Sequence, residues 1–385
     1  MRIAFYAPLK PPTHATPSGD RRVAELYMDA LAGAGHRVEL VSTFRSYDGT
    51  GDAARQAGLR EQGIALGRRL GAQWRDAPAL ARPELWFTYH AYYKSPDWLA
   101  PEASAALGIP YVIAEASHAA KRAGGPWDVG HQGALAAIRR ANLLLCPTRD
   151  DVEGLCAVAE DSGRVALLPP FLDPAPFRAA AGARERHRAR LARDRGLDAG
   201  VPWIVAVAMM REGDKLASYR QLASVLARLQ DMRWQLLVAG DGPARAAVES
   251  ALADAIPGRA LLLGALGQAD IAALNAAGDL CLWPAVNEAY GMALLEAQAA
   301  GLPVVSCATR GVPDIVEHGR TGELAAPGDV SALAALAATL LADASARRRL
   351  GEAAAQAVVA RHSVASAAAS LRRLLGALAA PASSP

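Results

Sequence analysis

The chain has 385 residues, of which 52% are hydrophobic and 21% are charged, so it can fold and has no composition typical of disorder. Its 41 basic and 38 acidic residues nearly cancel, to a net charge of +3, which gives no positive field for binding nucleic acid. Aromatic residues, at 5%, leave little for base stacking. We expect two domains from the length, and no nucleic-acid partner.

The apolar segments predict a cytoplasmic protein. Met1 and Arg2 lead directly into a short apolar run that ends at Pro8, which is too brief for a signal peptide. The longest apolar stretch is bounded by Asp329 and Asp343 and is well short of a membrane span. Peripheral contact with the inner membrane face stays open. The four cysteines form no Cys-x-x-Cys pair and have no histidine at metal-ligand spacing, so no metal site is expected.

Short apolar runs alternate with amphipathic segments, which is typical of βα units that form a parallel sheet. In the first half, strands are predicted at residues 3–7, 38–42, 85–89, 111–114, 143–146 and 165–168. A helix is predicted to begin at Asp20, as its N-cap, and to end at Gly33 and Gly35.

A proline-rich segment, residues 169–176, follows these strands and contains four prolines. Such a segment cannot continue a helix or a central strand, so we place the domain boundary here and assign residues 1–175 to the first domain. The arginine-rich stretch from Arg178 to Arg195 is interpreted as a solvated helix face or a linker, with contact to an anionic partner as the alternative.

A second βα series predicts a second domain, residues 176–362. Its strands are expected at residues 203–208, 234–239, 260–263, 280–283 and 303–306. Residues 363–380 form an amphipathic helix, with leucines at helical spacing and Arg372 and Arg373 opposite them. The tail, residues 381–385, is predicted to be disordered. The expected fold class is therefore α/β, with two successive parallel sheets.

The segment from Asn287 to Asp329 holds the clearest candidate site. Glu288 and Glu296 are separated by seven residues, and Gly291 lies where a loop turns into a helix. A helix that begins there offers free N–H groups and its positive dipole end to a phosphate. Glu296 would then accept hydrogen bonds from ribose hydroxyls, and Glu288 would reach hydroxyls of a transferred sugar. Two solvated surface glutamates are the alternative.

The same segment resembles glycosyltransferase family 4, the retaining GT-B enzymes also called glycosyl transferases group 1. The paired glutamates are followed by the family's Gly-x-Pro-Val-Val strand at residues 301–305, its Gly-x-x-Asp-Ile-Val turn at residues 311–316 and its Thr-Gly segment at residues 319–322. The resemblance implies two Rossmann-like domains whose parallel sheets face a central cleft. It also implies a final helix that crosses back to the first domain.

The family resemblance further implies a retaining, metal-independent enzyme that moves a sugar from a nucleotide-sugar donor, such as a UDP- or GDP-sugar, and needs no cofactor. The acceptor would be a sugar, a lipid-linked molecule or a small molecule. The donor would bind the second domain and the acceptor mainly the first, and the reaction would follow domain closure. The departing phosphate would take the acceptor proton.

Residue roles follow from the same resemblance. Lys215 and Arg211 would meet the donor diphosphate and stabilise the charge that develops as the glycosidic bond breaks, and the catalytic candidates are Glu288, Lys215, Arg211 and His118. The donor-binding candidates are Glu296, Gly291, Met292, Ala293, Tyr290, Gly19 and Gly240. A tight turn is the simpler role for Gly240, and with Gly242 it lacks the third glycine of a nicotinamide-binding motif.

Acceptor-side candidates follow the predicted strands of the first domain, where ligands bind in open α/β sheets. They are Ser18, Asp20, His90, Tyr92 and Lys94. A structural histidine is the alternative for His118 and for His90.

Two other functions stay open. One is a GT-B relative with another reaction, such as a nucleotide-sugar epimerase or a phosphorylase, although the paired glutamates argue against an epimerase. The other is a non-catalytic protein that binds a sugar nucleotide or acts as a scaffold. The sequence leaves the donor sugar, the base, the acceptor and the oligomeric state open.

Overall fold

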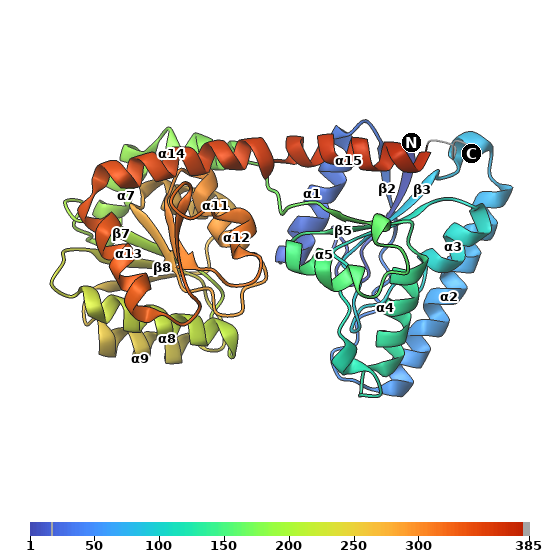
Figure 1. Cartoon of the computed structure of the whole chain (residues 1–385), viewed down its shortest axis with the longest axis horizontal. Coiled ribbons are helices and arrows are strands. Elements are labelled where there is room, and N and C mark those ends of the chain that lie inside the picture. The colour runs from blue at the N-terminus through green and yellow to red at the C-terminus, as the bar shows by residue number, and fades with distance from the viewer. Residues whose placement is uncertain (17, 380–385) are drawn as a thin grey trace. The chain divides into compact units, whose positions relative to one another are not determined.

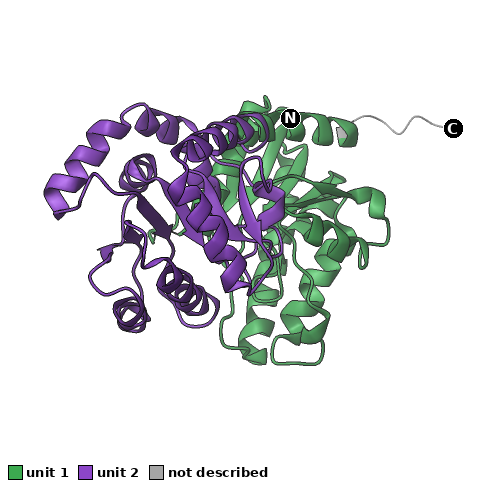
Figure 2. Cartoon of the chain, turned by 60° about the vertical axis from the view of Figure 1, so that its left-hand side comes forward, with its two compact units in different colours: residues 1–169, 364–385 green, residues 170–363 purple. Residues whose placement is uncertain are grey.

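The computed structural model describes residues 1–16 and 18–379, so the tail at residues 381–385 lies outside the described residues. The chain divides into two compact units (Figure 2). Unit 1 is Met1–Pro169 together with the segment that begins at Val364, and unit 2 is Pro170–Ser363. Each unit holds a six-stranded sheet with helices packed around it (Figure 1), which confirms the predicted α/β class.

The sheet of unit 1 is parallel, and its strands lie in the order β2-β1-β3-β4-β5-β6. The strands are β1 (Arg2–Tyr6), β2 (Arg37–Ser42), β3 (Leu85–Tyr89), β4 (Tyr111–Ala114), β5 (Leu143–Cys146) and β6 (Val165–Leu167). The chain proceeds outward from β1 in one direction and from β3 in the other. The loops after β1 and β3 therefore separate at the topological switch point, where ligands bind in such sheets.

The helices of unit 1 are α1 (Gly19–Gly33), α2 (Ala53–Asp76), α3 (Ala100–Leu107), α4 (Asp128–Arg140), α5 (Arg149–Cys156) and α15 (Val364–Ala379), with 3-10 turns at Ala79–Ala81, Ala120–Arg122 and Ser162–Arg164.

The predicted N-cap of α1 is wrong by two residues. Ser18 has extended backbone and its side chain accepts a hydrogen bond from the N–H of Arg21 at 3.2 Å, whereas Asp20 lies in the first helical turn.

A buried carboxyl group fixes the loop that follows β3. Asp97 is fully buried and accepts hydrogen bonds from the hydroxyl of Tyr111 and the N–H groups of Leu99 and Ala100, each at 2.9 Å, and from Thr88. Burial raises the pKa of Asp97, and these hydrogen bonds oppose the rise only in part. The network anchors the far end of the loop that carries three acceptor-side candidates.

The sheet of unit 2 is also parallel, in the order β12-β11-β10-β7-β8-β9. Its strands are β7 (Trp203–Val207), β8 (Gln235–Ala239), β9 (Ala260–Gly264), β10 (Leu280–Trp283), β11 (Val304–Cys307) and β12 (Gly322–Ala325). The switch point lies between β7 and β10. Strand β12 was not predicted, because it begins with glycine and includes Glu323 and so has no continuous apolar run.

The helices of unit 2 are α6 (Ala175–Ala181), α7 (Arg184–Arg195), α8 (Asp214–Leu226), α9 (Arg245–Ala255), α10 (Gln268–Ala277), α11 (Met292–Ala299), α12 (Val312–Ile315), α13 (Val330–Ala342) and α14 (Ala344–Arg361), with a 3-10 turn at Ala227–Leu229. No single helix among the described residues has the length and apolar character to cross a membrane. Among the described helices, α13 and α14 have the required length and apolar character only when they are taken as a pair, and this pair is bent by 104°.

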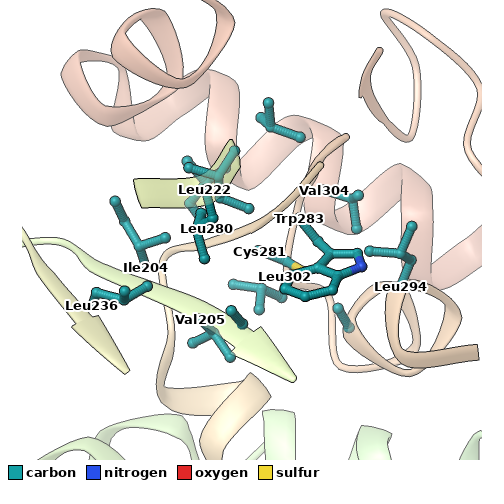
Figure 3. Close-up of a cluster of buried hydrophobic side chains, with 14 of the residues drawn as sticks. Ile204, Val205, Leu222, Leu236, Leu280, Cys281, Trp283, Leu294, Leu302 and Val304 are labelled. Carbon is teal, nitrogen blue, oxygen red and sulfur yellow. The ribbon is translucent and has the colours of Figure 1, made fainter. Parts of the chain in front are cut away.

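Buried apolar side chains hold the two central strands of unit 2 in place (Figure 3). Ile204 of β7 and Leu280 of β10 are fully buried and lie in one cluster with Leu222 of α8 and Leu294 of α11. Full burial of such a side chain is worth about 1.5 to 3 kcal/mol. The cluster thereby fixes β7 and β10, and the loops that follow these strands carry candidate donor residues.

Part of the arginine-rich stretch is structural. Arg184 and Arg188 of α7 form ion pairs with Asp279 at 2.6 and 2.8 Å, and they donate to the carbonyls of Ala276 and Ala277 at the end of α10. The interpretation of this stretch as a solvated face is therefore wrong for these two arginines. Their partners are more than 85 residues away in the chain, so no local pattern could indicate them.

Helix α15 packs alongside α1 (Figure 1), so the end of the described chain completes unit 1. Leu371 and Leu375 are fully buried. Arg372, which was expected only to face away from them, donates hydrogen bonds from Nε to the carbonyl of Ala34 at 3.1 Å and from Nη2 to that of Gly33 at 3.0 Å. A cation at the end of a helix satisfies carbonyls that have no partner within the helix.

Candidate functional site

The donor-side candidates gather at the switch point of unit 2. The loop after β7 leads into α8, whose second residue is Lys215, and the loop after β10 carries Glu288 and leads into α11. Because β7 and β10 are parallel neighbours, both loops leave the same edge of the sheet. Two segments more than 70 residues apart in the chain are thereby brought together.

Lys215 and Glu288 form an ion pair. The Nζ of Lys215 donates a hydrogen bond to Oε2 of Glu288 and lies 5.7 Å from the ring centroid of Trp283. The two side chains are only 23% and 19% exposed, so water screens the pair less than it screens a surface pair. The carboxylate of Glu288 therefore balances the positive charge of Lys215.

The loop after β10 is held in an uncommon conformation. Ala285 and Asn287 have positive φ angles of 57° and 50°, a conformation that is uncommon for alanine, is tolerated better by asparagine, and is frequent at functional sites. The N–H of Val286 donates to Oγ of Ser218 at 3.0 Å, and Nδ2 of Asn287 donates to the carboxylate of Asp214 at 2.9 Å. These bonds tie the loop to α8. Sequence analysis did not select Ser218, Asp214 or Asn287, because only the fold brings them together.

Helix α11 begins at Gly291, which has a φ of 78° and serves as its N-cap without a side-chain hydrogen bond. The N–H groups of Met292 and Ala293 lie in the first turn, where helix geometry supplies no acceptor. Met292, Ala293 and Glu296 are the residues of α11 that are not buried. The structure therefore places these three candidates on one accessible face of the helix, and Tyr290, half-buried, directly before its start.

Two further donor-side candidates differ in their surroundings. Gly240, with a φ of 147°, follows β8, and a Cβ atom there would lie 1.8 Å from the carbonyl oxygen of Ala208. In the structure Gly240 permits a close approach of two backbone segments. Arg211 is exposed in the loop after β7, and its side chain forms no hydrogen bond or ion pair with other described residues.

At the switch point of unit 1, Asp20 follows β1 and His90 follows β3, and their Oδ1 and Nδ1 atoms lie 3.2 Å apart. His90 has a φ of 60°. Burial lowers the pKa of His90, but the carboxylates of Asp20 and Glu115 raise it more strongly, so the net pKa is raised. His90 in turn lowers the pKa of Asp20. Ser18 and Gly19 form the start of α1 beside this pair.

The remaining candidates of unit 1 form two groups. The ring of Tyr92 lies 5.1 Å from that of His90, and Lys94 follows two residues later. His118, in the loop after β4, instead contacts His131 of α4, with 5.0 Å between the ring centroids. Burial lowers the pKa of His118, and the nearby His131 adds to this effect. No contact between His118 and His90 is found among the described residues.

Sequence analysis missed Tyr93 and Trp127, whose rings lie near Lys94, and Arg122, which lies near the same two rings. The available signal was a local concentration of aromatic residues, since a chain with 5% aromatics has three tyrosines between residues 89 and 93. Nowhere in residues 1–16 and 18–379 do three His, Cys, Asp or Glu side chains form a group that could hold a metal ion.

Part of the chain is similar to known proteins. Residues 201–343 match the family model described as glycosyl transferases group 1. N-acetyl-alpha-D-glucosaminyl L-malate synthase of Bacillus anthracis is 30% identical over 175 residues, which are 45% of this chain and 45% of that protein. The chain spans about half the length, or less, of the first curated relatives it matches.

Solved structures share the two-unit fold across nearly the whole chain. Sucrose-phosphate synthase from Thermosynechococcus elongatus has a TM-score of 0.74 and 22% identity, and the match covers 98% of both chains. HepE of Anabaena, solved in complex with UDP-glucose, has a TM-score of 0.71 and 16% identity over 98% of this chain and 100% of that chain. At these identities the likeness establishes the GT-B fold.

Proposed function

We propose that the chain is a glycosyltransferase of the family whose model, glycosyl transferases group 1, matches residues 201–343, and that it transfers a sugar from a nucleotide-sugar donor to a hydroxyl group of an acceptor. Its GT-B fold supports the proposal. The observation that carries the proposal is the ion pair of Lys215 with Glu288 beside the start of α11, at the switch point of unit 2. A carboxylate, a cation and a helix N-terminus meet there, as sugar hydroxyls and a diphosphate require.

On the donor side, the N–H groups of Met292 and Ala293 would bind the diphosphate, and Glu296 would accept hydrogen bonds from the ribose hydroxyls. Met292, Ala293 and Glu296 share one accessible face of α11, which supports this assignment. Glu288 would bind hydroxyls of the transferred sugar. The complex of HepE with UDP-glucose favours a UDP-sugar over a GDP-sugar as the first donor to test.

In the proposed reaction, the bond between the anomeric carbon and the diphosphate oxygen breaks, and a bond from the acceptor oxygen to the same carbon forms with retained configuration. The acceptor proton goes to the departing phosphate. Lys215, Arg211 and the start of α11 would stabilise the negative charge that develops on the diphosphate, so the site would need no metal ion. The anomeric configuration of the product, read from its NMR coupling constants, tests retention, and an inverted product would refute it.

The acceptor would bind unit 1, near Asp20 and His90, at the other switch point. The ring of Tyr92 beside His90 offers a face against which a sugar can stack. A glycan, a lipid-linked sugar and a small alcohol all fit this general proposal. A cytoplasmic location belongs to the same proposal.

The first test is a thermal-shift panel of UDP-, GDP- and ADP-sugars and free nucleotides, with and without EDTA. It compares the wild type with Glu296→Ala and with Glu352→Ala, which removes an exposed glutamate from α14. A ligand at 100 times its Kd stabilises the folded state by about 2.7 kcal/mol. We expect a selective shift that EDTA does not change, that is smaller in Glu296→Ala and that is preserved in Glu352→Ala.

Other outcomes would favour the other functions. If a nucleotide sugar binds but is neither transferred nor hydrolysed with any acceptor, the chain is a non-catalytic binding protein. Conversion of the donor into its epimer without an acceptor would indicate an epimerase. If no nucleotide shifts the melting temperature, the donor-site assignment is wrong.

A further inference from the structure

Two cations and two aromatic rings form a compact cluster in unit 1, which we call the cation platform: Tyr93, Lys94, Arg122 and Trp127. The rings of Tyr93 and Trp127 lie 6.0 Å apart at an interplanar angle of 80°. The Nζ of Lys94 is 4.8 Å from the ring centroid of Trp127, and the Cζ of Arg122 is 4.8 Å from that of Tyr93. Each cation also lies within 6 Å of the other ring.

The two positive charges of the platform have no counter-charge. Neither Lys94 nor Arg122 forms an ion pair within the described parts of the chain, although both are half-buried. Of the carboxylates in the adjoining segments, Asp48 pairs with Arg55 at 3.7 Å, and Asp128 accepts from the N–H of Gly124 at 2.8 Å but forms no ion pair with either cation. The Nε of Arg122 is buried without a hydrogen-bond partner. Close, unbalanced cations raise the free energy of the empty site, and an anion would lower it.

The platform is rigidly built, since hydrogen bonds from distant segments fix its parts. The Nε1 of Trp127 donates to the carbonyl of Asp48 at 3.1 Å, and the N–H of Asp48 donates to the carbonyl of Lys94 at 2.8 Å.

The neighbouring backbone is held just as closely. Gln56 donates to the carbonyl of Pro126 at 2.8 Å and accepts from the N–H of Gly130 at 3.1 Å. A Cβ atom on Gly130 would lie 2.0 Å from the carbonyl oxygen of Tyr93, so helix α4 lies directly against this loop. A site fixed in this way before binding loses little entropy when a ligand arrives.

The platform is continuous with the proposed acceptor side. Tyr93 and Lys94 lie in the loop after β3, which also carries His90, and the ring of Tyr92 lies 5.1 Å from that of His90 and 5.4 Å from that of Tyr93. Arg122 and Trp127 follow β4, the neighbouring strand. A ligand at the platform would therefore extend along a row of rings toward the pair formed by Asp20 and His90.

From the unbalanced cations Lys94 and Arg122 on the rings of Tyr93 and Trp127, we propose that unit 1 binds an acceptor with an anionic group, a phosphate or a carboxylate, on a polyhydroxylated molecule. The inference rests on the proposed function for its acceptor side. A guanidinium stacked on a ring keeps its N–H edge for an anion, and the ring faces pack against C–H groups of a sugar. The half-buried cations favour a discrete ligand over an extended lipid surface.

The test measures binding of three matched probes, glucose 6-phosphate, glucuronic acid and glucose, by isothermal titration calorimetry at low ionic strength. The full chain is compared with Lys94→Met, Arg122→Met and the control Lys121→Met, which removes an exposed neighbouring lysine that contacts neither ring. We expect at least one acidic probe to bind at least tenfold more tightly than glucose, and added salt to weaken its binding. Lys94→Met and Arg122→Met should each raise its Kd about tenfold, and Lys121→Met should not.

The two acidic probes show whether phosphate or carboxylate is preferred. Equal affinity for charged and neutral probes, or equal affinity in the wild type and both platform variants, would overturn the inference. So would phosphatidylglycerol vesicles that bind the wild type but not the variants when no soluble probe binds. The thermal shift with nucleotide sugars, recorded on the same proteins, separates the two proposals, because a preserved shift with no acidic-probe binding would leave the donor site intact and refute the platform alone.

Discussion

Lys215 of α8 donates a hydrogen bond to the carboxylate of Glu288, which lies in the loop after β10, 73 residues further along the chain. The pair is about one-fifth exposed and lies near the ring of Trp283. In the proposed donor site, Glu288 would hold Lys215 close to the diphosphate. A side chain positioned in advance for a developing charge is the arrangement from which electrostatic catalysis gains most.

Replacement of Lys215 is expected to reduce turnover more than folding stability. In Lys215→Met, kcat with a nucleotide-sugar donor should fall about 100- to 1000-fold, because a cation that stabilises the leaving diphosphate is lost. The melting temperature should fall only modestly, because loss of one partner from a pair that is 23% and 19% exposed costs about 1 to 2 kcal/mol, between the values for exposed and buried pairs. Arg233→Met, which breaks an exposed ion pair with Asp198, is the control and should keep its kcat. An unchanged kcat in Lys215→Met would remove this residue from the mechanism.

The pair of Asp20 and His90 should make stability depend on pH. The raised pKa of His90 means that its contribution is complete below its usual value of 6.5 and is lost as pH rises through the raised pKa. The lowered pKa of Asp20 means that its contribution is present above 3.8 and is lost as pH falls through the lowered pKa. The pair therefore stabilises the fold most between about pH 4 and pH 6.5.

Urea unfolding from pH 5 to pH 9 checks this dependence. The free energy of unfolding of the wild type, relative to that of His90→Asn, should decrease as pH rises above 6.5. Asparagine tolerates the positive φ at this position, so the variant removes the charge without adding backbone strain. Parallel curves for the two proteins would contradict the assigned pair.

Gly240 should tolerate no side chain. In Gly240→Ala the new Cβ would meet the carbonyl oxygen of Ala208 at 1.8 Å, in a backbone conformation with a φ of 147°, so the free energy of unfolding should fall by at least about 2 kcal/mol. Gly267→Ala is the matched control, because no heavy atom lies within 4 Å of its added Cβ. Similar urea midpoints for the two variants would refute the steric argument.

Arg372 and Arg373 are adjacent on α15, but only Arg372 donates to the carbonyls that end α1. Arg372→Ala should lower the free energy of unfolding by about 1 to 2 kcal/mol, because it leaves these carbonyls without a donor. Arg373→Ala, at an exposed position, should stay within about 0.5 kcal/mol of the wild type. Equal losses in the two variants would show that helix propensity, and not the hydrogen bonds, sets the effect.

The sequence predicted the sheet best where strands are buried on both faces. Residues 85–89 and 280–283 were predicted within their observed bounds, because buried parallel strands are continuous apolar runs. Strand β12 was missed because it is half-exposed and contains a glutamate. The roles of Arg184 and Arg188 were misjudged for another reason: their partner, Asp279, is distant in the chain, and the pairing exists only after folding.

The sequence predicted those parts of the candidate site whose residues lie close together in the chain. Glu288, Gly291 and Glu296 lie in one short segment of the sequence, and a loop followed by a helix was sufficient to predict their arrangement. The positive φ angles that hold the loop are not predictable in this way. Nor was the cation platform, because the ring of Trp127 meets Lys94 only through the fold of unit 1.

The return of α15 to unit 1 sets an order for folding during synthesis. All six strands of unit 1 are complete once residue 169 has been made, but the helix that covers α1 begins only at Val364. At about 5 to 20 residues per second, the ribosome needs roughly 10 to 40 seconds to make the intervening segment. Unit 2, which is continuous in the chain, can fold in that interval. Until translation reaches Leu371 and Leu375, the nascent unit 1 exposes an apolar surface on α1 that a chaperone can recognise.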